Sequence, residues 1–107
     1  MGLPEIDVGL LGGGKHTQRL FGHSTRRRMM LTGYRVPGEE LYRLGVVEAC
    51  TTPDELMPAA MELARTIASK SPVSTRMIKH TLNVIEDMSL RDGYRYEQDQ
   101  TAAIAKT

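Results

Sequence analysis

The second half of the chain carries the start signals of three consecutive helices, which leaves little of it to form a sheet. Thr52 stands before Pro53 and Ser71 before Pro72, so a hydroxyl suited to the helix N-cap precedes a proline suited to the first helical position. Ser89 provides a third such N-cap. Apolar residues follow each signal at intervals of three and four, the spacing that gives a helix one apolar face. The sequence therefore predicts three long amphipathic helices.

Pro58 conflicts with the first of these helices, because Thr52 and Glu55 together make a capping box only a few residues before it. A proline inside a helix removes one amide donor and crowds the preceding turn. Either the helix begins later than its capping box implies, or it bends at Pro58.

Glycines divide the first half into short elements. We expect a short strand or an extended run at residues 6–11, and a strand at residues 46–50, "VVEAC". Three short helices are expected between them: one capped by Thr17 and ended by Gly22, one capped by Ser24 and ended by Gly33, and one with Pro37 in its first turn and Gly45 at its end. This set has too little sheet to pack against, so we expect a piece of a longer protein.

The stretch "GLLGGGKHT" matches seven of the eight positions of a phosphate-binding P-loop. The eighth position needs a hydroxyl for magnesium, but His16 occupies it and Thr17 comes one residue late. No later apolar strand ends in a clear magnesium-binding Asp. A glycine-rich turn between two elements is the more common origin of such a pattern, and we prefer it to a nucleotide site.

Residues 24–45 imitate a helix-turn-helix, and three consecutive arginines could contact phosphates. Glu39 and Glu40 would lie in the recognition helix, however, and the net charge is only +1. We therefore expect no nucleic-acid partner. The preferred interpretation places Arg26, Arg27 and Arg28 in solvent. The three apolar residues that follow them, Met29, Met30 and Leu31, would then lie in the core.

Composition argues against several other classes. No apolar run approaches the roughly 20 residues of a membrane span, so no membrane partner is expected. Cys50 is the single cysteine, which suits a reducing, cytoplasmic location, and we expect it to be a buried structural thiol. The three histidines lack the spacing of a metal triad, so no metal site is expected.

Glu5 is the strongest chemical candidate. It stands just before an apolar run that leads to Gly12, Gly13 and Gly14. A partly desolvated carboxyl group is what general acid–base chemistry uses, and the glycines would allow backbone and substrate to approach closely. Chemistry alone favours the alternative, a surface glutamate in a loop.

Five segments in register resemble the crotonase superfamily, the enoyl-CoA hydratases and isomerases. They are "PEIDVGLL", "TQRL", "MMLTGYRV", "LGVVEACTTPDEL" and "AMELARTIASKSPVSTRMIK". The resemblance covers essentially the whole chain and places it in the C-terminal part of the family domain. It implies an α/β crotonase fold, a ClpP-like β-βα spiral, of which this chain is a mostly helical fragment. Residues 1–50 would end the spiral core, and residues 51–107 would be assembly helices of a homo-oligomer, a trimer or hexamer.

By this resemblance Glu5 is the second of the two catalytic glutamates of hydratases. The substrate would be an acyl-CoA thioester, bound at Leu11, Gly12, Gly13 and Gly14, and no cofactor is implied. The expected activity is hydration of a trans-2-enoyl-CoA through an oxyanion-stabilised enolate. The alternatives are enoyl-CoA isomerase and a non-catalytic interaction protein. Lys15 and His16 depart from the family pattern, since they replace two glycines. The first glutamate and the oxyanion donors would lie outside this chain, which we therefore expect to be inactive alone.

Overall fold

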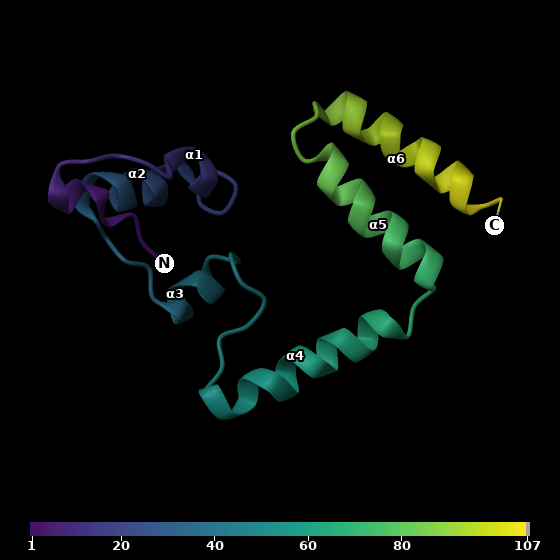
Figure 1. Ribbon diagram of the computed structural model, residues 1–107, viewed down its shortest axis with the longest axis horizontal. Helices are drawn as coiled ribbons and strands as arrows, with labels where there is room; N and C mark the ends of the chain where they lie inside the picture. Colours follow the sequence, from purple (N-terminus) through teal and green to yellow (C-terminus); the bar gives the residue numbers. More distant parts are fainter. Residues whose placement is uncertain (107) are drawn as a thin grey trace. The chain divides into compact units, whose positions relative to one another are not determined.

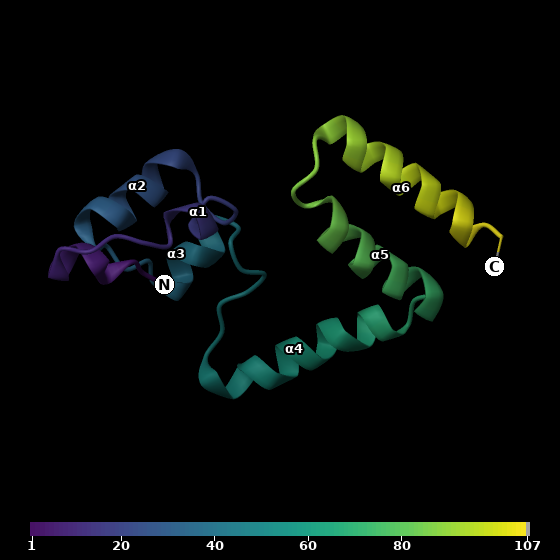
Figure 2. The same ribbon diagram turned by 45° about the horizontal axis from the view of Figure 1, so that its top comes forward.

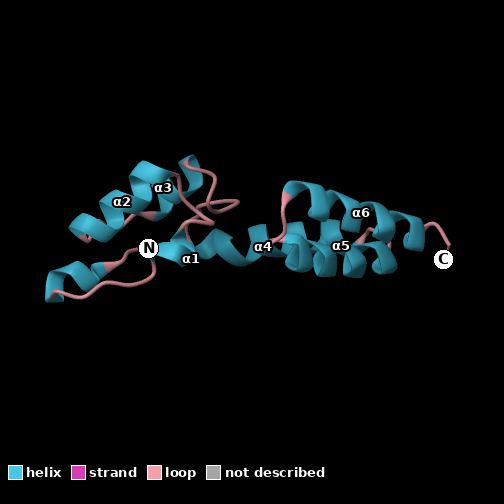
Figure 3. Ribbon diagram, turned by 90° about the horizontal axis from the view of Figure 1, so that it is seen from above, coloured by secondary structure: helices cyan, strands magenta, loops and turns pink. Residues whose placement is uncertain are grey.

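The computed structural model describes residues 1–106, which form helices joined by loops (Figures 1 and 3). The elements in order are η1 (Pro4–Val8), α1 (Gly14–Thr17), α2 (His23–Thr32), α3 (Gly38–Arg43), α4 (Pro53–Ala68), α5 (Pro72–Ile85) and α6 (Leu90–Ile104). The β pairing among these residues is one isolated antiparallel bridge between Gly2 and Arg35. The chain divides into two compact units, Met1–Thr52 and a second that begins at Pro53.

The first unit is built around α2, on which η1 and α1 pack (Figures 1 and 2). Its buried apolar side chains come from α2, α3 and the segments beside them: Phe21, Met29, Val36 and Leu41. Leu3, Tyr34 and Val46 pack against this core from outside. The start of the chain is tied to the same core, because the Val36 amide donates to the Met1 carbonyl at 2.7 Å.

Two helix ends in this unit agree with the sequence and one helix start does not. Gly33 ends α2 with a φ of 73°, and Gly45 follows the end of α3 with a φ of 77°, both left-handed conformations that glycine adopts without strain. The predicted N-cap Ser24 is wrong: α2 begins at His23, and Gly22 is its N-cap. Pro37 lies at the N-cap of α3, one residue before the helix begins.

Both predicted strands are wrong. The run at residues 6–11 begins within the 3-10 helix η1, because Pro4 starts that helix and Gly9 ends it in a left-handed conformation. Residues 46–50 form no strand; the Val46 amide instead donates to the Leu41 carbonyl at 2.9 Å and closes a turn after α3. Cys50 beyond this turn is exposed, contrary to the expected burial. A strand needs a partner, and the described residues offer only the single bridge.

The helix expected between residues 17 and 22 is also wrong. Thr17 is the last residue of the short α1, where it is buried. Its hydroxyl donates to the Gly14 carbonyl at 3.0 Å, so the Thr17 side chain bonds to the first residue of α1 and does not cap a following helix.

The second unit follows the sequence prediction closely. α4 begins at Pro53, and the side chains of Ser71 and Ser89 cap α5 and α6. α4 continues through Pro58 as one helix, so the late start does not occur.

α5 and α6 pack side by side as an antiparallel pair (Figures 1 and 3). A Cβ added at Gly93 of α6 would lie 3.6 Å from the Cβ of Ile85 on α5, which is an ordinary van der Waals contact. Among the described residues from Pro53 onward, only Thr81 and Gly93 are buried. The apolar faces predicted for these helices are therefore largely exposed: Leu56, Leu63 and Ile67 on α4, and Ile78 and Leu82 on α5. No helix of residues 1–106 has the length and apolar character needed to cross a membrane.

Candidate active site

Glu5 lies in η1, and its backbone is fixed by the turn that leads to the glycine loop. Its carbonyl accepts the Leu10 amide at 2.8 Å, while the carbonyl of Ile6 accepts the Gly9 amide at 3.1 Å. Pro4 restricts the backbone immediately before it. The residue is therefore held where the chain turns toward residues 10–14.

The Glu5 carboxyl group is unusual because one of its oxygens is buried and unpaired. The side chain as a whole is half-buried, but Oε2 has no hydrogen-bond partner among the described residues. Leaving a buried polar atom without a partner costs free energy, so most proteins avoid it. Oε2 of Glu5 thus lacks the hydrogen bond that a buried carboxylate oxygen ordinarily makes.

A groove of about 830 Å³ lies beside this turn, within the first unit. Its lining comes from η1, the glycine loop and one side of α2: Ile6, Gly9, Leu10, Leu11, Gly12, Gly13, Gly14, Lys15, Arg26, Arg27, Met30 and Leu31. The four predicted substrate-binding residues, Leu11 to Gly14, therefore all border one groove. Glu5 itself is not in the lining, although its neighbour Ile6 and its backbone partner Leu10 are. The volume falls in the range of small-molecule sites, roughly 300 to 1,000 Å³.

The three glycines of the loop differ in backbone conformation and in the space available for a side chain. Gly13 has a φ of 77°, and a Cβ there would lie 2.5 Å from Cδ2 of Leu3. A Cβ on Gly14 would collide with Sδ of Met30. Around Gly12 the space is open, with no heavy atom within 4 Å of an added Cβ. The left-handed backbone therefore explains Gly13, and at Gly14 the flexible Met30 side chain would have to move. Neither reason applies to Gly12, whose missing side chain leaves room in the groove.

The charged residues in the groove lining are all cationic. They are Lys15, whose Nζ donates to Oε1 of Gln18 at 3.0 Å, and Arg26 and Arg27 of α2. His16, the other departure from the glycine pattern, is exposed and does not line the groove.

Sequence reasoning missed the contribution of α2. Of the three residues expected in the core, Met29 is fully buried, but Leu31 is 70% exposed and borders the groove with Met30. The signal was present, because Arg26 and Arg27 precede Met30 and Leu31 by four residues, which places the pairs on one helix face. The third arginine differs: the Arg28 guanidinium lies 3.7 Å from the centroid of the Tyr34 ring.

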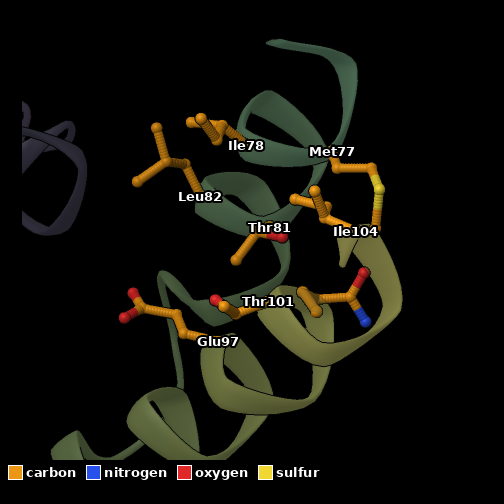
Figure 4. Close-up of a pocket in the computed structure, with 8 residues that line it drawn as sticks. Met77, Ile78, Thr81, Leu82, Glu97, Thr101 and Ile104 are labelled. Atoms are coloured by element: carbon orange, nitrogen blue, oxygen red, sulfur yellow. The ribbon is translucent and has the colours of Figure 1, made fainter. Parts of the chain in front are cut away.

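A smaller cavity of about 260 Å³ lies between α5 and α6 in the second unit (Figure 4). Its lining is mainly aliphatic and hydroxyl-bearing, and Glu97 is its one charged residue among those described. In residues 1–106 we find no cluster of three or more His, Cys, Asp or Glu side chains that could hold a metal ion.

Comparison with known proteins identifies several relatives. YngF of Bacillus subtilis (strain 168), named as an enoyl-CoA hydratase/isomerase, is 36% identical over 101 residues, which cover 92% of this chain and 39% of that protein. A carnitinyl-CoA dehydratase of Salmonella arizonae is 34% identical over 97 residues, covering 88% of this chain and 37% of the relative. A hexahydro-indene-carboxyl-CoA hydrolase of Mycobacterium tuberculosis is 36% identical, covering 94% and 40%. The chain thus spans about two fifths of the length of these relatives.

Solved structures agree with the predicted fold class. An enoyl-CoA hydratase subunit from Geobacillus kaustophilus superposes with a TM-score of 0.85 at 27% identity, over 99% of this chain and 42% of that one. An enoyl-CoA hydratase from Mycobacterium tuberculosis superposes with a TM-score of 0.83 at 22% identity, over 99% and 43%, which supports the fold alone. These neighbours confirm the crotonase fold class.

The profile of one protein family, described as enoyl-CoA hydratase/isomerase, matches residues 1–107. This match covers the glycine loop, α2 and the three long helices together. The chain belongs to the enoyl-CoA hydratase/isomerase family.

Proposed function

We propose that this chain is the C-terminal part of an acyl-CoA enzyme that adds water to a trans-2-enoyl-CoA thioester. The observation that carries the proposal is the buried, unpaired Oε2 of Glu5, on the turn that leads into the groove. The relatives whose names state an activity act on CoA thioesters, as a dehydratase and a hydrolase.

In this proposal Glu5 moves a proton at the α-carbon of the thioester. Hydration adds hydroxide at the β-carbon and a proton at the α-carbon. A second carboxylate, outside this chain, takes the other proton of the attacking water, while Glu5 donates its own. The negative charge that builds up on the thioester oxygen needs preorganised amide donors, which stabilise such an enolate. The acyl group lies along Leu11 and the three glycines.

Isomerisation of the double bond is the alternative within the same chemistry. There Glu5 would remove a proton from one carbon of the acyl chain and return it to another, without net addition of water. Product analysis separates the two, since hydration yields a hydroxyacyl thioester and isomerisation a shifted double bond.

The three long helices are proposed to serve assembly into a homo-oligomer. Most of their apolar side chains are exposed, including Leu56 and Met57 at 59% and 64%. Exposed apolar faces of this kind mark surfaces that another chain covers. This exposure also favours the second candidate, a non-catalytic interaction protein, which the experiment below distinguishes.

The test is Glu5→Gln in the complete protein that contains this chain, assayed with crotonyl-CoA. The amide keeps the shape of the side chain but cannot exchange the proton, so kcat should fall by a factor on the order of 10² to 10⁴. Binding of the thioester should be largely kept. The matched control is Glu39→Gln, an exposed glutamate of α3 whose loss should leave the rate unchanged. An unaltered rate in Glu5→Gln would exclude Glu5 as the acid–base group.

The 107-residue chain alone provides a second test. It lacks the proposed amide donors and the second carboxylate, so it should not hydrate crotonyl-CoA. Robust turnover by this chain would contradict its assignment to one part of the enzyme.

A further inference from the structure

The groove lining combines aliphatic and cationic side chains. Leu10, Leu11, Met30 and Leu31 supply the aliphatic surface. Lys15, Arg26 and Arg27 supply three positive charges, and no acidic side chain of the described residues is in the lining. The chain as a whole carries a net charge of only +1, so this positive charge is local to the groove.

The two groove arginines also lack the partners that occupy other arginines of the first unit. Arg43 is paired with Glu40, and Arg28 stacks on Tyr34. Arg26 and Arg27 make no ion pair or ring contact within residues 1–106. Lys15 donates to an amide oxygen, which leaves its charge uncompensated. Three cations on one groove without a carboxylate suit an anionic ligand.

We propose that the groove selects acyl-CoA thioesters whose acyl group ends in a carboxylate. The inference rests on the proposed function, which places the acyl group along residues 11–14. The acyl carbons lie against the leucines and Met30, and the terminal carboxylate accepts hydrogen bonds from Lys15, Arg26 and Arg27. Arginine suits this task because its planar guanidinium can bind both oxygens of a carboxylate.

The phosphates of coenzyme A are the competing source of negative charge. The long pantetheine arm separates these phosphates from the thioester. A groove that holds the acyl group therefore contacts the substituents of the acyl chain and not the phosphates. A cationic acyl group, such as the trimethylammonium-bearing one of carnitinyl-CoA, would be repelled by the same three side chains.

The experiment measures equilibrium binding in the complete protein carrying Glu5→Gln, where turnover is suppressed. The ligands are glutaconyl-CoA, which ends in a carboxylate, trans-2-hexenoyl-CoA, which is neutral and of similar length, and coenzyme A alone. Glutaconyl-CoA should bind at least ten-fold more tightly than hexenoyl-CoA. Lys15→Gln, Arg26→Gln and Arg27→Gln should each weaken glutaconyl-CoA binding by roughly ten-fold, since a charge-assisted hydrogen bond contributes on this scale. Hexenoyl-CoA binding should change less than two-fold.

Arg65→Gln on α4 is the matched control, because Arg65 lies in the other unit and does not line the groove. An equal loss of affinity for both thioesters and for coenzyme A would assign the cations to phosphate and overturn the proposal. Equal binding of the two thioesters by the unsubstituted groove would overturn it as well. Failure of the catalytic proposal shows instead as a rate unaffected by Glu5→Gln, which is a separate measurement.

Discussion

Gly13 lies so close to Leu3 that a Cβ added to it would be 2.5 Å from Cδ2 of Leu3, closer than two carbon atoms pack. The glycine loop is thus fitted against the segment that precedes Glu5. Gly13→Ala must relieve this contact and also hold alanine at a φ of 77°. We expect it to lower the free energy of unfolding by about 1–3 kcal/mol, measured by urea denaturation. Gly12→Ala is the control and should not destabilise. Equal losses for both variants would contradict the packing argument.

Met29 and Val36 are the largest fully buried side chains of the first unit, and Met29 is the larger of the two. Met29→Ala should lower the free energy of unfolding by about 2–5 kcal/mol, because it leaves a cavity in the core that Met29 forms with Phe21, Val36 and Leu41. Met29→Leu keeps the volume and should cost less than about 1.5 kcal/mol. Leu31→Ala, at a position 70% exposed, should change stability by no more than about 0.5 kcal/mol. Thermal and urea unfolding of the three variants would rank them.

Ser89 accepts the amide of Asp92 at 3.1 Å and so satisfies one donor at the start of α6. Ser89→Ala should reduce the stability of α6 by about 1 kcal/mol, whereas Ser89→Asp should preserve it. Hydrogen exchange at the Asp92 amide measures this directly. Unchanged protection in Ser89→Ala would show that the cap contributes nothing.

Glu40 gives a pH prediction in the first unit. Arg43 donates to both carboxylate oxygens of Glu40, one of them through Nε at 2.9 Å, and this lowers the pKa of Glu40 below its ordinary value of 4.5. The contribution of the pair is complete above the ordinary pKa and is lost as the pH falls through the lowered one. The pair is exposed, so the effect on unfolding should be small. Carboxyl NMR titration should show the lowered pKa, and Arg43→Gln should return it toward 4.5.

The sequence predicts the second unit well because its signals are local. A hydroxyl cap bonds to an amide three residues later, as Ser71 does to the amide of Ser74, and no distant residue takes part. Pro58 was the one conflict, and α4 passes through it. One missing hydrogen bond in a helix of 16 residues is outweighed by the turns on either side.

The first unit was harder to predict because its elements are set by contacts between distant residues. The apolar run after Glu5 has a strand-like composition, but no strand partner stands beside it within residues 1–106. Pro4 and Gly9 therefore decide its conformation. Cys50 was expected to be buried on the strength of a strand that does not form.

The sequence predicts only part of the groove lining. Leu11 to Gly14 lie together on one groove because they are consecutive, whereas the role of α2 depends on how η1 and α1 pack against it. Such packing cannot be read from residue types. The helical spacing of Arg26, Arg27, Met30 and Leu31 shows that they share a face, but only the fold shows that this face borders the loop.

The open space around Gly12 means that this residue shapes the groove but takes no part in packing the fold. Its neighbours Gly13 and Gly14 lie against the side chains of Leu3 and Met30, whereas an added Cβ at residue 12 would contact nothing within 4 Å. Evolution can therefore exchange this residue to shorten or reshape the groove while the rest of the domain stays intact. A gene duplicate could acquire a new range of acyl groups through a single codon, and a saturation library at this position would sample that range with few unfolded members.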